Sequence, residues 1–544
     1  MPTSEPIGPT GPVIARRTFL TGVVATALAA GCSGGDGDAE PADGLDDVSP
    51  ETAADLPPVP PSLPAELFAL GVASGDPLPD SVILWTRLVS DPLAGDGGLP
   101  EAPLPVRWEV AASEAFDDVV ASGDAVAEPA LAHSVHIDAS GLEADTWYWY
   151  RFSVGERTSP VGRTRTAPEA GDDAERLRFV FASCQNYQEG YWPAHHEIAA
   201  EDIDLVVFLG DYIYEEAPVA DQVRTYRSEA PADLAGYRSR YGEYKADPAL
   251  QAAHAHVPWV CTWDDHEVQN NYAGDVPQSP GATGASGEFH DRRAAAYQAY
   301  YEHMPLRVEP PDGPDATLYR SVGWGDLARF YVLDGRQYRS EQACDVPQDL
   351  GLSCDAVADD ERTMLGDEQE AWLGDALAGS NATWNVVAQQ TIVSKITVPL
   401  GADEGLNLDQ WDGYPAARRR LVDQLREVGN PVVITGDIHA SGVGVVTDDP
   451  DDDSSPPLVP ELVGTSISSI IPPELVALVE AAAAASPSVR YVQPRQRGYV
   501  VCDVTPEALD ASFRYVSTTV APQAEVTTGA RWVLAAGDPE PRPG

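Results

Sequence analysis

Residues 204–215 read DLVVFLGDYIYE, and this stretch decides the fold class. Its five consecutive apolar residues, 205–209, lack the polar alternation of a strand that has one face in water. Such a run is typical of a strand covered on both faces, as in an α/β protein. Gly210 then permits a tight turn, and Asp211 places a carboxylate directly after the strand.

Similar apolar runs recur further along the chain and alternate with helical stretches. They lie at residues 176–184 (RLRFVFASC), 257–265 (VPWVCTWDD), 327–334 (LARFYVLD), 384–391 (WNVVAQQT) and 431–437 (PVVITGD). Four runs end in side chains that can bind metal ions: Cys184; Asp211; Asp264, Asp265 and His266; Asp437 with His439. Because ligands of open α/β sheets bind beyond the carboxyl ends of strands, we expect these side chains to meet.

Each of these residues has a simpler explanation when it is taken alone. An aspartate such as Asp211 is more often a turn or helix-capping residue, and a buried thiol such as Cys184 is more often inert. The acids around His266 suit a solvated loop, and the spacing of Asp437 and His439 is common by chance. All of these residues follow predicted strands of one α/β body, and such a coincidence is improbable by chance. We therefore predict that they form a metal site.

Residues 63–167 have a different pattern, in which short alternating strands are separated by turn signals. Examples are residues 81–88 (SVILWTRL), 104–111 (LPVRWEVA) and 146–154 (TWYWYRFSV). Several short strands at this spacing predict a small all-β sandwich. The segment contains no candidate catalytic cluster, so we interpret it as a packing or binding module.

The amino terminus, residues 1–32, has the pattern of an export signal. Arg16 and Arg17, followed by Phe19 and Leu20, resemble the twin-arginine signal. The apolar run ends at Cys32 in a sequence similar to a lipoprotein cleavage box, which makes Cys32 a candidate lipidation site; ordinary cleavage nearby is the alternative. Residues 33–62 are rich in Gly, Pro and Asp and predict a solvated linker. We expect a periplasmic or extracellular protein, lipid-anchored if Cys32 is acylated.

The composition limits the partners of the chain. Its 544 residues include 86 Asp and Glu against 34 Lys and Arg, a formal net charge of −52. This excess argues against nucleic acid as a partner and against a basic patch for anionic lipid, because both need clustered cations. We expect membrane contact only through a lipid anchor, and a monomer. Cys344 and Cys354 bracket a short polar loop, which predicts a disulfide in an oxidising compartment.

From Phe68 to about Arg514 the chain resembles the PhoD-type alkaline phosphatase/phosphodiesterase family. The motifs that carry the resemblance are LGVASGDPLPDSVILWTRL (70–88), LVVFLGDYIYE (205–215), WDDHEVQNNYAGD (263–275), RRAAAYQAYYEHMPLR (292–307), WDGYPAARRRL (411–421) and VVITGDIHASG (432–442). The resemblance implies a metallophosphatase-like layered αββα sandwich in residues 175–520, preceded by a fibronectin-like all-β sandwich domain. Residues 521–544 remain as a tail.

The resemblance also implies a centre that holds a ferric ion, Fe(3+), beside calcium, Ca(2+). Carried over residue by residue, the iron ligands would be Cys184, Asp211, Tyr214 and His439. Asp211 would bridge to calcium, and Asp265 and Asp437 would be further calcium ligands. The residue types agree with this division, because thiolate and phenolate suit a trivalent transition metal and carboxylates suit calcium.

The resulting hypothesis is hydrolysis of a phosphate ester by a metal-activated water. His266 is the candidate to donate a proton to the leaving oxygen. We expect Asp264 or Glu267 to orient its imidazole, and Asn270 to be a polar neighbour. Arg336 has two interpretations, a contact to the phosphate or a buried structural ion pair.

Two alternatives stay open at the level of sequence. The same metal core suits a phospholipase D-like enzyme or a phosphodiesterase of cell-wall polyol phosphates. A non-catalytic calcium-binding surface protein is the alternative of another class, and it predicts a ligand set with gaps, which the sequence does not show.

Overall fold

The computed structural model describes residues 56–544, except residues 173, 279–285, 345–349, 451 and 453. The predicted export signal, Cys32 and most of the predicted linker lie outside the described residues. Among the residues that the structure describes, the helices are all too short or too polar to cross a membrane.

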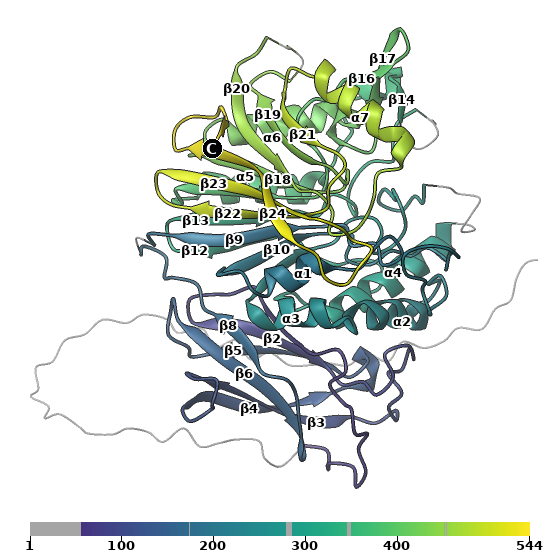
Figure 1. The fold of residues 1–544 in the computed structure, drawn as a ribbon, viewed down its shortest axis with the longest axis vertical. Coiled ribbons are helices and arrows are strands. Elements are labelled where there is room, and N and C mark those ends of the chain that lie inside the picture. Colours follow the sequence, from purple (N-terminus) through teal and green to yellow (C-terminus); the bar gives the residue numbers. More distant parts are fainter. Residues whose placement is uncertain (1–55, 173, 279–285, 345–349, 451, 453) are drawn as a thin grey trace, which may run out of the picture. The chain divides into compact units, whose positions relative to one another are not determined.

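A ten-stranded sheet runs through the molecule (Figure 1). Its spatial order is β25 (Arg542–Pro543), β24 (Val526–Ala535), β23 (Ala508–Val516), β22 (Gly498–Val504), β9 (Leu177–Ala182), β10 (Leu205–Leu209), β11 (Trp259–Thr262), β1 (Val72–Gly75), β2 (Ser81–Arg87) and β5 (Ser134–Ser140). Strands β9, β10 and β11 are parallel, so their carboxyl ends share one edge. The apolar run that precedes Asp211 forms β10, in the middle of this parallel group.

A seven-stranded sheet packs against the first one. Its order is β12 (Arg320–Trp324), β13 (Ala328–Val332), β15 (Trp384–Ala388), β18 (Pro431–Thr435), β20 (Pro457–Val463), β19 (Ser441–Thr447) and β21 (Val489–Gln493). Alternate residues of β10, Leu205, Val207 and Leu209, lie in the core between the sheets with Val386 and Ile434 of the second sheet. One face of each sheet is therefore buried by the other.

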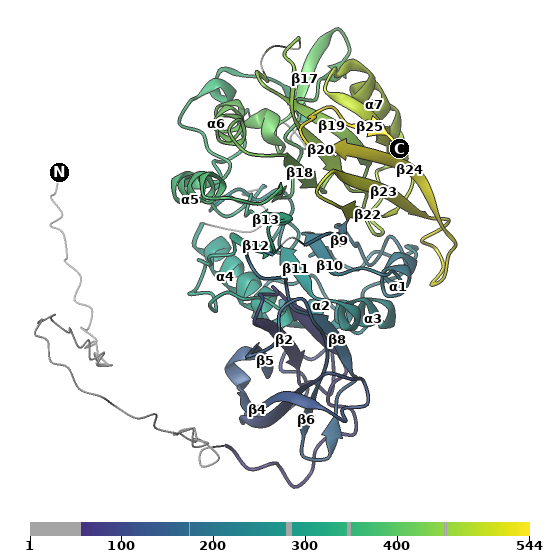
Figure 2. The same cartoon turned by 90° about the vertical axis from the view of Figure 1, so that its left-hand side faces the viewer.

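Helices cover the two outer faces (Figures 1 and 2). The ten-stranded sheet carries α1 (Pro193–Ile198), α2 (Leu234–Lys245), α3 (Pro248–His256) and α4 (Ser286–His303), and the seven-stranded sheet carries α5 (Gly366–Ala378) and α6 (Pro415–Leu425). Val206 and Phe208, the other residues of β10, join the core under α1–α4. The run is thus apolar on both faces because both faces are covered, and the layered αββα architecture is confirmed.

The amino-terminal region is an all-β sandwich, as predicted. One of its sheets contains β4 (Val119–Ala127), β3 (Leu104–Ala111), β6 (Trp147–Val154), β7 (Arg157–Thr158) and β8 (Gly162–Arg165). The other is formed by β1, β2 and β5, which face it across a common apolar core. These three strands also extend the ten-stranded sheet, because Gly75 of β1 pairs in parallel with Trp259 of β11. The two predicted bodies therefore share one sheet.

The predicted tail is wrong. Within residues 521–544, β24 pairs with β23 along nine residues of that strand, from Ala508 to Val516. β25 then pairs with β24 at the sheet edge. The segment is therefore part of the sheet and not a tail. Its strand character is hard to recognise in the sequence because several residues of β24 are polar and face solvent.

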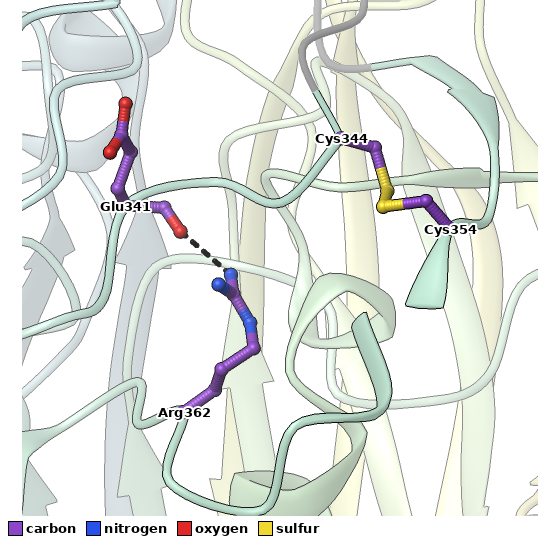
Figure 3. The surroundings of a disulfide bond; sticks show 4 residues. All are labelled: Glu341, Cys344, Cys354 and Arg362. Carbon is purple, nitrogen blue, oxygen red and sulfur yellow. Dashed lines mark hydrogen bonds between the residues drawn. A yellow bond between two sulfur atoms is a disulfide. The ribbon is translucent and has the colours of Figure 1, made fainter. Parts of the chain in front are cut away.

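Cys344 and Cys354 form a disulfide, with Cα atoms 5.8 Å apart. Figure 3 shows it beside the hydrogen bond from the Arg362 guanidinium to the Glu341 carbonyl (2.7 Å). The segment between the two cysteines contains β14 (Leu350–Leu352), which forms a small sheet with β17 (Asp403–Asn407) and β16 (Val398–Leu400). The disulfide therefore closes the segment that supplies one strand of this sheet.

Candidate active site

The predicted ligands converge where the two large sheets present their carboxyl ends. Cys184 follows β9, Asp211 follows β10, and Asp437 and His439 follow β18 of the other sheet. All four have a positive φ, between 56° and 61°, the left-handed region that residues other than glycine rarely adopt. Such conformations persist where the surroundings impose them and are common at functional sites. The chain thus turns sharply at each strand end and points a ligand-type side chain to the same place.

Gly210 shows why the strand ends lie so close. A Cβ atom at this position would lie 2.5 Å from the backbone nitrogen of Asp264, which no side chain tolerates. Its own φ of +100° also favours glycine. The absence of a side chain therefore lets the turn after β10 contact the turn after β11, and it brings Asp211 next to Asp264 and Asp265.

One side of Asp211 carries a thiol, a phenol and an imidazole. The Tyr214 hydroxyl donates to Asp211 Oδ2 (2.8 Å) and lies 3.2 Å from Nε2 of His439. The Sγ of Cys184, a carboxylate oxygen of Asp211 and a ring nitrogen of His439 lie within 4.8 Å of one another. Burial, with the nearby Asp211 carboxylate, raises the pKa of Cys184 and of Tyr214 well above their usual values. Both groups therefore hold their protons more tightly than usual, and a bound cation would favour the loss of these protons.

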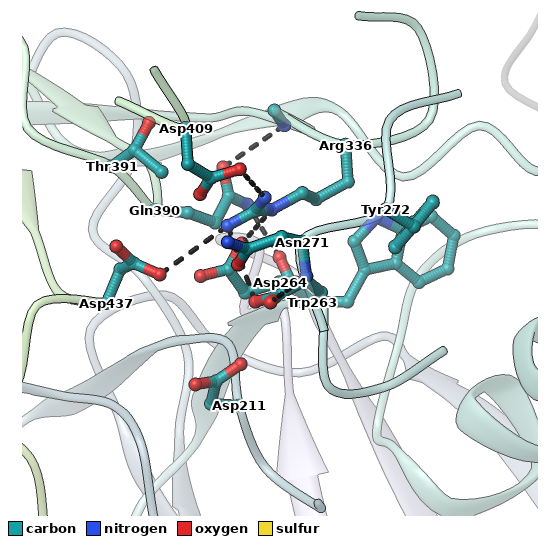
Figure 4. Close-up of polar contacts among 12 residues, drawn as sticks. Asp211, Trp263, Asp264, Asn271, Tyr272, Arg336, Gln390, Thr391, Asp409 and Asp437 are labelled. Atoms are coloured by element: carbon teal, nitrogen blue, oxygen red, sulfur yellow. Dashed lines mark hydrogen bonds and ion pairs between the residues drawn. The ribbon is translucent and has the colours of Figure 1, made fainter. Parts of the chain in front are cut away.

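The other side of Asp211 is a cluster of carboxylates around a buried guanidinium (Figure 4). Arg336 is fully buried and pairs with four acids: Asp264, Asp265 (3.4 Å), Asp409 (2.9 Å) and Asp437 (3.5 Å). Arg339 also pairs with Asp409. Of the two interpretations of Arg336, the structure supports the buried ion pair. Its side chain is committed to the protein's own carboxylates.

Two buried carboxylate oxygens of this side lack a hydrogen bond. Oδ2 of Asp264 has no partner among the described residues, and Oδ1 of Asp265 has only its 3.4 Å ion pair with Arg336. Carboxylate oxygens from Asp211, Asp264 and Asp265 lie within 4.8 Å of one another. Buried acceptors without partners are costly, and a bound cation would satisfy them. The two sides therefore offer two adjacent ligand groups that share Asp211.

His266 is oriented by a residue that the sequence reasoning did not select. Its Nδ1 lies 2.7 Å from Oε2 of Glu215, and its ring stacks on Tyr214 at 4.0 Å. Burial lowers the pKa of His266, but the Glu215 and Asp211 carboxylates outweigh it and raise the pKa well above its usual value. The expectation that Asp264 or Glu267 orients this imidazole is wrong, since both are engaged elsewhere. Glu215 directly follows Tyr214 in the opening stretch, and that adjacency was the available signal.

Glu267 holds the backbone of the site together. Its carboxylate accepts hydrogen bonds from the backbone nitrogens of Asp211 (3.1 Å), Tyr212 (2.6 Å) and Asp264 (2.9 Å). Burial raises its pKa to about 7. Asn270 donates its backbone N–H to Glu215 (2.8 Å), so it supports the residue that orients His266.

Three further residues at the site were missed. Ser469 donates its hydroxyl to the Tyr214 oxygen (2.7 Å), Gln410 donates to Asp437 Oδ2 (2.6 Å), and Asp409 neutralises Arg336. All three come from loops far away in the sequence. They do not follow strand ends, so the sequence pattern could not select them. The one available signal was that Arg336, if buried, requires a carboxylate partner such as Asp409.

The site opens into a cavity of about 610 Å³. Asp211, Asp265, His266, Asp437 and His439 all line it. Cys184 and Tyr214 do not line the cavity and lie behind this surface, fully buried. A substrate in the cavity would therefore meet His266 and the shared carboxylates directly.

Comparisons with known proteins agree with this geometry. The model of the PhoD-like phosphatase family matches residues 179–513, and that of its N-terminal domain matches residues 54–168. The chain is 46% identical over 475 residues to alkaline phosphatase D of Bacillus subtilis (strain 168), covering 86% of this chain and 80% of that protein. A solved structure of PhoD superposes with a TM-score of 0.84 at 44% identity, covering 89% of this chain and 93% of the other.

These matches cover both the sandwich and the layered body, and they include every strand end that carries a candidate ligand. The alternative of a non-catalytic surface protein is therefore set aside. The chain belongs to the PhoD-like phosphatase family and is a phosphoric ester hydrolase of the alkaline phosphatase type.

Proposed function

We propose that the protein is an exported, metal-dependent hydrolase of phosphate esters that uses a metal-activated water or hydroxide. The observation that carries the proposal is the convergence of Cys184, Asp211, Asp437 and His439 from two sheets, each in a left-handed conformation. A constellation of this kind stores strain that packing alone does not require.

The donor types support two different metals. Cys184, Tyr214, His439 and Asp211 would hold Fe(3+), because thiolate, phenolate and imidazole suit a transition metal. Asp211, Asp265 and Asp437 would hold Ca(2+), a hard cation that prefers carboxylate oxygens. Burial, aided by Arg497, lowers the pKa of His439 to about 3, so its imidazole is neutral and free to bind a metal.

When bound, such metals neutralise the phosphoryl oxygens and lower the pKa of a bound water. The chain's own contribution is orientation and proton transfer. Glu215 engages Nδ1 of His266 and leaves Nε2 for the substrate. Because carboxylates hold His266 in its protonated form, it would donate a proton to the leaving oxygen.

Export is proposed from the amino-terminal sequence. The Arg16-Arg17 pattern would direct the chain to a route that moves folded proteins, and Cys32 would be the acylated residue if the cleavage box is used. Intact-mass measurement of the mature protein from a membrane fraction tests this: a diacylglyceryl-modified Cys32 as the first residue is expected. A soluble mature form that lacks Cys32 would contradict the lipid anchor.

The test of the activity is a substrate panel with matched variants. Purified protein is assayed on p-nitrophenyl phosphate, bis-p-nitrophenyl phosphate and a phospholipid, before and after calcium chelation. We expect hydrolysis that chelation abolishes and calcium restores. Asp437→Asn and His266→Gln should each lose at least about a hundredfold in kcat/KM, whereas Glu507→Gln, on the exposed turn before β23, should be unchanged.

The metal assignment is tested separately by metal analysis and visible absorption. Ferric ion bound by phenolate or thiolate absorbs visible light, so we expect a coloured protein that contains iron and calcium. A colourless, active protein that contains only zinc would contradict the iron assignment but not the hydrolase activity.

A further inference from the structure

The cavity in front of the active site extends well beyond the candidate metal ligands. Its far part is bounded by α7 (Pro473–Ala485), by β19 and β21, and by the loop that precedes β16. Figure 1 shows α7 beside β16 and β21. This far part, which we name the apolar arm, has a lining very different from the carboxylates at the active-site end.

One wall of the apolar arm is a single face of α7. Leu475, Leu478, Val479, Ala482 and Ala483 all line the cavity. Their spacing of three and four residues places them along one stripe of the helix. The opposite face carries Glu474 and Glu480, which are exposed. Alanines occupy much of the exposed side as well, so the helix is apolar over most of its surface. Its side chains Leu478 and Val479 are turned to the cavity, while Val476 packs in a small core cluster.

The facing wall is apolar as well. It is formed by Ile392, Ile396 and Val398 before and within β16, and by Val492 of β21. Glu461 and Asp412 are the charged side chains here. The carboxylate of Glu461 accepts hydrogen bonds from the backbone nitrogens of Val393 (2.7 Å) and Ser394 (2.9 Å), and Asp412 pairs with Arg418. The hydroxyl groups of Ser394 and Ser441 are the polar groups of this wall that remain without a hydrogen-bond partner among the described residues.

The apolar arm is continuous with the active site. Ile438 lines the cavity between Asp437 and His439, and it packs with Ile471 and Val479 beside α7. The apolar surface therefore begins one residue from the candidate ligands. Leu475, which lines the cavity, remains 39% exposed, so an apolar group bound there could cover it.

We propose that the apolar arm binds an aliphatic chain of the phosphate ester whose phosphoryl group lies at the active site. The inference rests on the proposed function and narrows its substrate class to amphiphilic phosphate esters. A polyol phosphate carries more hydroxyl groups than Ser394 and Ser441 could pair with, and the face of α7 that lines the cavity has no polar side chain, so the remaining hydroxyl groups would lose their hydration without compensation. An alkyl chain gains from every methylene that leaves water.

The experiment compares two phosphate monoesters that differ only in chain length. Binding of methyl phosphate and octyl phosphate is measured by titration calorimetry on the metal-loaded His266→Gln protein, in which hydrolysis should be too slow to disturb the titration, with octyl phosphate below its micellar concentration. Each buried methylene is worth about three- to fourfold in affinity, so octyl phosphate should bind at least about a hundredfold more tightly. Equal affinities for the two esters would overturn the proposal.

Matched variants on α7 locate the binding site of the chain. Ala482→Phe and the less buried Ala483→Phe fill the arm and should remove most of the preference for octyl phosphate, with methyl phosphate unaffected. Ala481→Phe, on the exposed face, is the control and should keep the preference. An equal loss in the control would overturn the assignment to the arm. Thermal unfolding checks that the variants fold.

Methyl phosphate separates this proposal from the proposed function. It has no chain for the arm, so its binding reports on the phosphate site alone. If neither ester binds, the proposed phosphate site itself is wrong. If both bind equally well, the phosphate site stands and the apolar arm does not bind the substrate.

Discussion

The two sides of Asp211 are built on different principles. On one side, Cys184, Tyr214 and His439 are neutral or have pKa values that burial shifts against the charged form. On the other side, Asp265 and Asp437 are acids that the protein already pairs with Arg336. The first side is uncharged without a bound cation, whereas the second is held in place by a cation of the chain itself.

This difference suggests a division of labour. The carboxylate side is preorganised by an internal ion pair, so the proposed calcium ion would complete a site that is already in place. The thiol and phenol side needs a strongly polarising ion to deprotonate its ligands. Asp211 belongs to both sides, and the variants below test whether the sides can be separated.

The largest effect is expected for Asp211→Asn, which weakens both sides at once. We expect both metals to be lost and kcat/KM to fall by about a thousandfold or more, because the metals supply several kcal/mol of transition-state stabilisation. Metal analysis by mass spectrometry, with kinetics on p-nitrophenyl phosphate, checks this. Retention of either metal at full occupancy would mean that Asp211 does not join the two sides.

Arg336→Met breaks the carboxylate side alone. Removing the guanidinium takes the common cation away from Asp264, Asp265 and Asp437, while Asp409 keeps Arg339, and this should cost about 3–5 kcal/mol of unfolding free energy. Urea unfolding of the metal-free protein measures this cost, and added calcium should recover part of it. Arg419→Met is the control, because its pair with Asp360 is exposed and should be worth about 1 kcal/mol or less. Equal effects of the two substitutions would refute the role of Arg336.

Tyr214→Phe breaks the other side alone. We expect the visible absorption and the iron to be lost, calcium to remain, and kcat/KM to fall by about a hundredfold. Absorption spectra and metal analysis of one sample decide the outcome. Simultaneous loss of calcium would show that the two sides fold and bind as one unit.

Glu215→Gln leaves both sides intact and changes only the support of His266. We expect kcat to fall by about ten- to a hundredfold, as for residues that orient a catalytic group, with metal content unchanged. The neighbouring Glu216→Gln is the matched control, because Glu216 is exposed and contacts Asn186 and not His266. A loss of metal in Glu215→Gln would place Glu215 among the metal-holding residues.

The smallest change in kinetics is expected from added salt, which does not act directly on either side of Asp211. The net charge of −52 repels a phosphate ester at long range, and added salt screens this repulsion. We expect KM to fall by about twofold as potassium chloride rises from low concentration to physiological ionic strength. An unchanged KM would mean that the surface charge does not govern the approach of the substrate.

The layers and strand ends could be predicted because they depend on local patterns. The run before Asp211 is apolar on both faces, and Asp437 and His439 follow a run of the same kind. Contacts that depend on distant loops could not be predicted. Arg336 reaches Asp264 across 72 positions, and no short motif encodes that pairing. The choice of Glu215 over Glu267 for His266 likewise depends on the turn after β10, which only the fold defines.

The order of strands in the ten-stranded sheet has a consequence for how the chain folds during synthesis. β9, the first strand of the layered body, pairs with β10 on one side and with β22, close to the carboxyl terminus, on the other. β1 of the sandwich likewise pairs with β11, which is synthesised much later. Because these pairings join residues hundreds of positions apart, the sheet closes only once nearly the whole chain has left the ribosome, and folding is expected to be slow. A chain truncated at either end would leave a central strand unpaired and prone to aggregation.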